Sequence, residues 1–301
     1  MPFTSILIAT DLTPRTLVTL PVIAGLVARL GADVTVAYAD ADAADLHGTA
    51  RTLEQRSVKA HLDELQAAAT ALGLAPQVRV LSGEPVEALQ HAMDRGGYDL
   101  LVLVHDGTPR DRGSVTADLI GDCAAPVLVF HAGRVRPELD RPRRLDSVLV
   151  TVDTEDDRSA PIRAAHRITL GVGGKMRVGT ILKERGIEPA VDGSTPLLPP
   201  VPAGRVADAE AAHLKLVALC NGIGANHAGV SVAAAADPAA GLVALAIDAG
   251  VDAIVAAPHA RGAIARLLLG SVTRRLIDLS PLPVMVISER AAQRFGPRSA
   301  K

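Results

Sequence analysis

Short apolar runs alternate with longer amphipathic segments along the whole chain. In the first half, the runs SILIAT, DVTVAYA, PQVRVL, DLLVLV and PVLVF are rich in aliphatic residues, as buried strands are. The segments between them have apolar residues at helical spacing, and the one that starts at Pro14 ends at Gly31, a residue suited to a helix C-cap. The second half repeats this order with VLVTV, MRVGTI, GVSVAA, DAIVAA and PVMVI. Near-continuous apolar strands joined by helices predict parallel sheets covered on both faces.

The two halves also share sequence words in the same order. SILIATD, which ends at Asp11, matches SVLVTVD, which ends at Asp153, and GSVT occurs at 113–116 and at 270–273. The separation of matching residues grows from 142 at the first word to 157 at the second, which indicates insertions in the second copy. One insertion falls around GSTPLLPPVPAG, and one of four residues comes just before the second GSVT. The chain is therefore predicted to be a tandem duplication of one domain.

Each copy is predicted to form a doubly wound, open parallel sheet of five strands in the order 3-2-1-4-5, a Rossmann-like α/β fold. The predicted divisions are a first domain at 1–133, a basic linker at 134–145, a second domain at 146–288 and a tail at 289–301. In such a sheet, ligands bind beyond the carboxyl ends of strands one and four, where the strand order reverses. Each GSVT would begin a helix at this crevice, and a helix N-terminus favours an anion.

The fifth strand of each copy would lie at an edge of its sheet. PVLVF and PVMVI are apolar throughout and carry no guarding lysine, so we expect something to cover them. Two such strands in one chain can pair with each other about a pseudo-twofold axis. We expect this pairing between Val127 to Phe130 and Val284 to Ile287; a homodimer and a regulatory protein partner are left open.

Composition excludes several kinds of partner. A chain that is 49% apolar with a formal net charge of −2 suits a globular protein without a polyelectrolyte partner. With no Trp, two Tyr and three Phe, stacking platforms for single-stranded nucleic acid are not expected. Charged residues interrupt every long apolar stretch, and the N-terminal residues show no signal-peptide pattern, so we predict a cytoplasmic protein without a membrane partner.

Cysteine and histidine usage predicts no metal site. Cys123 and Cys220 fall at non-equivalent places in the two copies, which argues against a disulfide framework and predicts two buried core residues. The nine histidines show no paired ligand spacing.

Taken together, these residues resemble the universal stress protein family in its tandem two-domain form, across nearly the whole chain. The resemblance is carried by ILIATD and VLVTVD, by the two GSVT words, and by APVLVF and LPVMVI. It implies a fold like that of the adenine nucleotide alpha hydrolases, and ATP or another adenine nucleotide as the candidate cofactor.

ATP-binding members of that family carry a loop of the form Gly-x2-Gly-x9-Gly-Ser or Thr, whose amides and hydroxyl hold the ribose and phosphates. In the second copy, Ala257, Ala260, Gly270 and Ser271 keep this spacing, with alanine at two of the glycine positions. In the first copy, Val104 stands at the leading position, and five residues separate the next two glycines where nine are expected. The resemblance thus places nucleotide in the second copy and makes the first site degenerate.

The candidate residues gather at the two predicted crevices. Those of the nucleotide site are Asp153, Ala257, His259, Ala260, Gly270, Ser271 and Val272, and those of the degenerate first site are Asp11, Gly107, Gly113 and Ser114. For both aspartates the alternative is a turn cap after a strand. For His259, and for the arginines near the second GSVT, the alternative is an ordinary solvent-exposed side chain.

The resemblance implies a stress-response regulatory or binding protein that holds an adenine nucleotide chiefly in the second copy. One alternative is an interaction protein of the same fold that has lost nucleotide binding, which the two alanines and the short first loop favour. An enzyme that uses ATP is the third alternative, but neither GxxxxGK[ST] nor GxSxG occurs, so no catalytic residue is assigned. Slow ATP hydrolysis is left open.

Overall fold

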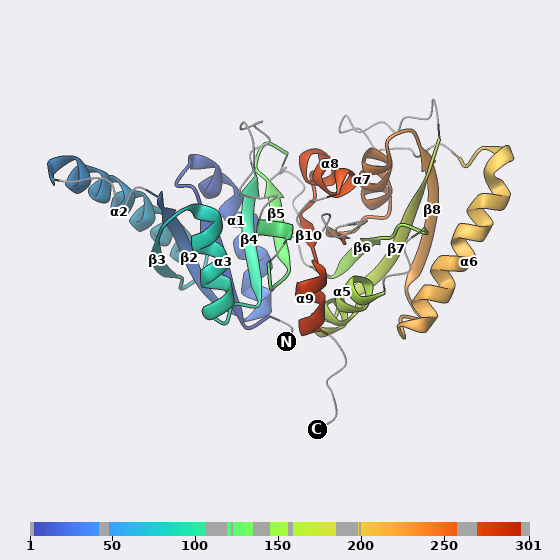
Figure 1. Ribbon diagram of the computed structural model, residues 1–301, viewed down its shortest axis with the longest axis horizontal. Coiled ribbons are helices and arrows are strands. Elements are labelled where there is room, and N and C mark those ends of the chain that lie inside the picture. The colour runs from blue at the N-terminus through green and yellow to red at the C-terminus, as the bar shows by residue number, and fades with distance from the viewer. Residues whose placement is uncertain are drawn as a thin grey trace, which may run out of the picture.

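The structure is a computed structural model, and Figure 1 shows its arrangement of strands and helices. It describes residues 3–41, 48–105, 119–121, 123–134, 145–155, 159–184, 198, 200–257 and 270–295. The first copy contains β1 (Ser5–Thr10), α1 (Pro14–Leu30), β2 (Asp33–Asp40), α2 (Gly48–Ala71), β3 (Gln77–Ser82), α3 (Pro85–Arg95), β4 (Leu100–His105) and β5 (Val127–His131). The second copy contains β6 (Ser147–Thr151), α5 (Ala160–Gly171), β7 (Lys175–Lys183), η2 (Ala203–Arg205), α6 (Val206–Gly222), β8 (Gly229–Ala235), α7 (Pro238–Asp248), β9 (Ala253–Ala256), α8 (Ser271–Leu279), β10 (Val284–Val286) and α9 (Glu289–Arg294).

The described strands form one sheet of ten, in the order β3-β2-β1-β4-β5-β10-β9-β6-β7-β8. Each copy has the predicted order 3-2-1-4-5, so the predicted fold class is confirmed. The registers match as well: Ile6 lies beside Val34 and Leu100 in the first copy, and Val148 lies beside Met176 and Ala253 in the second. Strands and helices therefore repeat as the duplicated sequence predicts.

Both faces of the sheet are buried, which explains why its strands are apolar at successive positions. On one face, Ile6 and Ile8 join a core that includes residues of α1, α2, α5, α6 and α9. On the other, Leu7 joins a core that includes residues of α3, α7 and α8. Alternate residues of a strand point to opposite faces, so a strand buried on both sides needs apolar residues throughout. Each core contains residues from both copies.

The two copies meet through their fifth strands, the pairing that the sequence analysis expects. β10 lies antiparallel to β5, with Met285 opposite Leu128. Leu101 donates its amide to the Pro126 carbonyl and Ile254 donates to the Pro283 carbonyl, so these prolines face β4 and β9. Backbone groups of successive strand residues face alternate neighbours. The residues whose backbone groups face the other copy are therefore Val127, Val129, Val284 and Val286.

A last helix, α9, forms where the sequence analysis assigns only a tail at 289–301. Ser288 caps it by accepting a hydrogen bond from the Ala291 amide at 3.0 Å, and Ala291 is fully buried. Arg290 pairs with Asp94 at 3.0 Å, and Arg294 donates to the Tyr98 carbonyl at 2.9 Å. These contacts reach back to the first copy, and they stabilise a helix too short to be stable alone. Residues 289–294 of the predicted tail are therefore helical, which the sequence analysis did not predict.

The cysteine prediction is confirmed, since Cys123 and Cys220 are both buried and free. Burial raises the pKa of both thiols. Among the described residues, no helix is both long and apolar enough to cross a membrane.

The seam between β5 and β10 predicts a particular pattern of hydrogen exchange. The amides of Val127, Val129, Val284 and Val286 face the other copy, and we expect them to exchange as slowly as amides of the central strand β1. Amides that face outward from the edge strands β3 and β8 serve as the fast-exchanging control. Rapid exchange at all four seam amides would rule the pairing out.

Candidate functional site

The strand order of the second copy reverses at β6, where the sequence analysis predicts the crevice. β6 pairs with β7 on one side and with β9 on the other, and all three strands are parallel. Val150 lies beside Val255, so Asp153 and Ala257 follow neighbouring strand ends at the same edge of the sheet. Ala257 is half-buried, directly after β9. Asp153 and Ala257 are the predicted loop residues that the structure describes, and they lie together at this edge.

Helix α8 adds its N-terminus to the same edge, because it leads from the carboxyl end of β9 back to the start of β10. Gly270 is the N-cap residue, with φ −57° and ψ 149°, and its carbonyl accepts the Arg274 amide at 3.0 Å. Glycine has no side chain with which to cap the helix, and no side-chain cap is present. Ser271 is exposed and Val272 is half-buried at the first turn. The positive end of the α8 dipole is thus available to an anion.

Asp153 and Asp11 both hold the turns that follow their strands. Oδ1 of Asp11 accepts hydrogen bonds from the Thr13 amide at 3.0 Å and from the Thr13 hydroxyl at 2.7 Å. Oδ1 of Asp153 accepts the Glu155 amide at 2.9 Å. Leu12, next to Asp11, has a φ of 59°, which an L-residue seldom adopts without such local support. These bonds are the turn-cap contacts weighed as the alternative for both aspartates.

A brace between α7 and α8, which the sequence analysis did not find, fixes the position of α8. Asp237 caps α7 by accepting the Ala239 amide at 3.0 Å, and its other oxygen accepts Nε of Arg275 at 2.5 Å. Of the Asp237 and Arg275 side chains, that of Asp237 is the more buried, with 23% of its surface exposed. The Asp-Pro pair before an apolar helix signals such a cap. Glu84 and Asp118 stand at the matching positions of the first copy, and two acids cannot form this pair.

A second polar cluster joins the first copy to α8. Nε2 of His105, at the end of β4, lies 3.1 Å from Oδ1 of Asp278, in the last turn of α8. His105 lies beside His131 in the β4–β5 register, and the two rings meet edge to face with centroids 5.4 Å apart. Neither histidine carried a signal in the sequence, because their proximity depends on strand register and on the pairing of the two copies. Together they connect the ends of β4 and β5 in the first copy to α8 of the second.

His131 is the buried member of this cluster. Only 9% of the residue is exposed, and in the part of the chain that the structure describes its buried Nδ1 has no hydrogen-bond partner. Burial lowers the pKa of His131, and the charges of His105 and Arg134 lower the pKa further. A neutral ring is therefore favoured at this place.

Several predicted site residues lie outside the described part of the chain: His259, Ala260, Gly107, Gly113 and Ser114. The comparison of the two glycine loops therefore stays a prediction. Among the described residues, no three His, Cys, Asp or Glu side chains are arranged to hold a metal ion.

These features define a class of protein: two doubly wound α/β domains in one chain, each with a reversal of strand order between its first and fourth strands. The family model described as the universal stress protein family matches residues 2–131 and 145–288. The chain belongs to the universal stress protein family, and the tandem arrangement expected from the resemblance is confirmed.

Solved structures share this architecture over nearly the full length. A universal stress protein from Archaeoglobus fulgidus is 22% identical, covers 94% of this chain with 95% of its own, and has a TM-score of 0.62. A putative universal stress protein from Pseudomonas aeruginosa is 14% identical, covers 99% of this chain with 98% of its own, and has a TM-score of 0.57. At these identities the likeness shows the fold alone. No curated protein sequence matches the chain.

The buried His131 predicts a loss of stability in mild acid. Its pKa lies below the ordinary value of 6.5, so the unfolded chain binds a proton that the folded protein resists as the pH falls below 6.5. The stability that neutral His131 contributes is therefore fully present above pH 6.5, and it is lost as the pH falls toward the pKa of the folded protein. We expect the free energy of unfolding to fall less between about pH 7 and pH 5 in His131→Phe than in the wild type.

Urea titrations across this pH range measure the effect. His213→Phe, which changes an exposed histidine of α6, is the matched control and should keep the wild-type slope. If His131→Phe and the wild type lose the same free energy of unfolding over this pH range, protonation of His131 does not cause the loss.

Proposed function

We propose that this protein is a regulatory binding protein of the universal stress type that holds one adenine nucleotide per chain, ATP or a close relative, in the crevice of its second copy. The observation that carries the proposal is the glycine-capped N-terminus of α8 at the reversal between β6 and β9. There an anion meets first-turn amides and the positive end of the helix dipole.

The described residues suggest how a nucleotide would lie. Phosphate would be held by the amides at the start of α8 and by the exposed hydroxyl of Ser271. Asp153, at the end of the neighbouring strand, would face the ribose or base side. Arg275 is engaged by Asp237, so its part is to hold α8 in place and not to contact phosphate. His259 and Ala260 would complete the loop by the family spacing.

The first copy is a poor second site. Its loop is shorter by four residues than the one in the second copy, so a triphosphate would be less well enclosed. His105, directly after Val104, already contacts Asp278 of the second copy. We therefore propose that the first copy supports the fold and the contacts with partners. The protein would act through the occupancy of its second site and not through catalysis.

A titration of ATP tests where the nucleotide lies. We expect one site per chain by calorimetry, with Ser271→Ala weaker by about 1 to 2 kcal/mol because a hydrogen bond to a charged group is lost. Ser114→Ala changes the matching residue of the first copy and should leave the affinity unchanged. Two sites per chain, or equal effects of both substitutions, would contradict this placement. Sustained ATP loss at ordinary enzyme rates would contradict a pure binding role.

The alanines of the second loop supply a gain-of-affinity test. Among the described residues Leu12 is the only non-glycine residue with positive φ, so Ala257 is not strained and only its methyl group can hinder the ligand. We expect Ala257→Gly combined with Ala260→Gly to tighten ATP binding about tenfold, which is roughly 1.4 kcal/mol. The matched control is Ala256→Gly, one residue earlier in the buried end of β9, which should not tighten binding. Unchanged affinity in the double variant would show that neither methyl group faces the nucleotide.

A further inference from the structure

The two outer edges of the ten-stranded sheet differ. β3 ends the sheet in the first copy and β8 ends it in the second, at matching positions of the two domains. Val36 pairs with Val78, and Val178 pairs with Val230, so Val80 corresponds to Val232. Val80 is 51% exposed, whereas Val232 is half-buried and the residues that follow it in β8, Ala233 to Ala235, are buried. The β3 edge, the open end of the sheet, is therefore more exposed than the β8 edge, the closed end.

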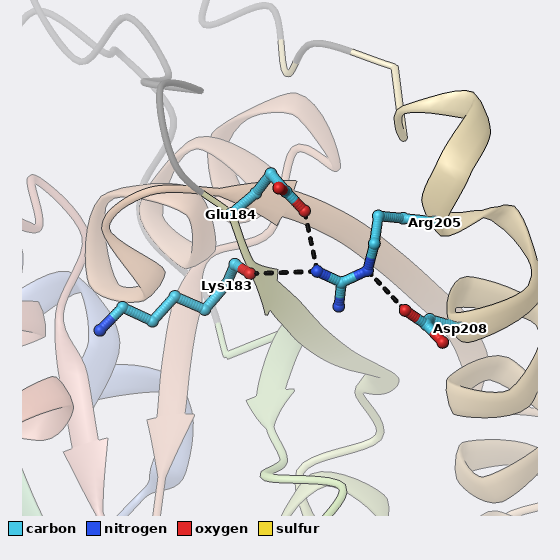
Figure 2. Close-up of polar contacts among 4 residues, drawn as sticks. All are labelled: Lys183, Glu184, Arg205 and Asp208. Carbon is cyan, nitrogen blue, oxygen red and sulfur yellow. Dashed lines mark hydrogen bonds and ion pairs between the residues drawn. The ribbon is translucent and has the colours of Figure 1, made fainter.

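Helix packing explains the closed end. α6 and α7 pack against β8, and Arg205 ties the start of α6 to the end of β7. Figure 2 shows this tie: Arg205 donates to Glu184 at 2.8 Å and to the Lys183 carbonyl at 3.4 Å, and it also pairs with Asp208. Both carboxylates raise the pKa of Arg205, Asp208 more than Glu184. The corresponding helix α2 also packs against β3, but its N-terminal part projects beyond the sheet (Figure 1).

At the open end, β3 presents backbone groups together with a groove. Gly83 donates its amide to the Asp40 carbonyl, so by alternation the backbone groups of Val78, Val80 and Ser82 face away from β2. A groove runs between β3 and α3, lined in the described part of the chain by 79–83, by Gly96, and by one stripe of α3 that contains Glu87, His91 and Arg95. An edge strand beside a groove of this length can add an extended segment as a further strand.

The charge of the groove selects the kind of segment. Arg79 stands on the α3 side of β3, where its guanidinium lies 3.4 Å from the Tyr98 hydroxyl, and Arg95 comes from the last turn of α3. The nearby Asp94 is paired with Arg290 of α9. Glu87 is the one carboxylate among the described lining residues, and it lies a full two turns before Arg95 on α3. The Arg79 end of the groove therefore favours carboxylates.

We infer that β3 and α3 form a docking surface for an extended, acidic segment of a partner protein, which adds to the sheet as a strand beside β3. A second copy of this chain is a poor occupant, because an antiparallel pair of β3 strands would bring two Arg79 side chains together. This surface lies at the β3 edge of the sheet, whereas α8 packs against β5 and β10 at its middle, and the inference does not rest on nucleotide binding.

Two synthetic peptides provide the probes: fluorescein-labelled TVEVEVT and its lysine counterpart TVKVKVT. By fluorescence anisotropy we expect the glutamate peptide to bind at least about tenfold more tightly than the lysine peptide. Binding should slow hydrogen exchange at Val78, Val80 and Ser82, whose amides face outward. No binding of the glutamate peptide up to about 1 mM would overturn the inference.

Substitutions then locate the peptide. Val80→Pro removes an outward amide and leaves the ladder to β2 intact, so it should weaken the glutamate peptide about tenfold. Val232→Pro makes the same change at the closed edge and should have no effect. Equal effects of the two prolines would overturn the inference.

Charge reversal avoids any doubt about folding of the proline variant. Arg79→Glu with Arg95→Glu keeps β3 unchanged in backbone and should reverse the preference, so that the lysine peptide binds more tightly. An unchanged preference would overturn the proposed polarity. Sedimentation tests the remaining occupant, a second copy of this chain. A dimer of the free protein that Val80→Pro dissociates would show that a second copy covers β3. That result would overturn the inference.

Discussion

The antiparallel contact between β5 and β10 is the constraint on which the rest of the molecule depends. An isolated copy would end in a short strand that is apolar on both faces, with unpaired backbone groups along one side. Pairing satisfies those groups and merges two cores on each face of the sheet, because Leu128 and Met285 share one core while Val129 and Val284 share the other. Once β5 and β10 are paired, α8 of the second copy lies against β5 of the first. The contact of His105 with Asp278 follows from that arrangement.

Most of the fold could be predicted from the sequence because local and global signals agree. The strands are apolar at successive positions, and α1 ends at Gly31, a residue suited to a C-cap. Because the sequence is duplicated, each strand or helix predicted in one copy is supported by its counterpart in the other. The place of the crevice follows from strand order alone, which is why Asp153, Ala257 and the start of α8 could be brought to one edge in advance. α9 was missed although Ser288 is a good N-cap, since its stability comes from contacts with the first copy such as Arg290 with Asp94.

Other parts of the site could not be predicted, because they depend on distances that no local pattern encodes. Asp237 and Arg275 are 38 residues apart and meet only when α7 and α8 pack side by side. His105 and Asp278 are separated by 173 residues and belong to different copies. Close packing is equally hidden: a Cβ on Gly241 would lie 2.9 Å from that of Ala235, so glycine lets α7 approach β8. A sequence shows a glycine there, but not the neighbour that requires it.

Joining the two copies in one chain changes the thermodynamics of their assembly. The β5–β10 contact forms within a molecule, at an effective concentration fixed by the chain, so it does not weaken on dilution as a dimer of separate subunits would. Within one chain, β5 of the first copy always pairs with β10 of the second, and neither strand pairs with an identical strand. A substitution in one half is therefore not imposed on both sides of the seam, which allows the halves to specialise. The Asp237–Arg275 brace in one half, opposite two acids in the other, is an asymmetry that identical subunits could not maintain.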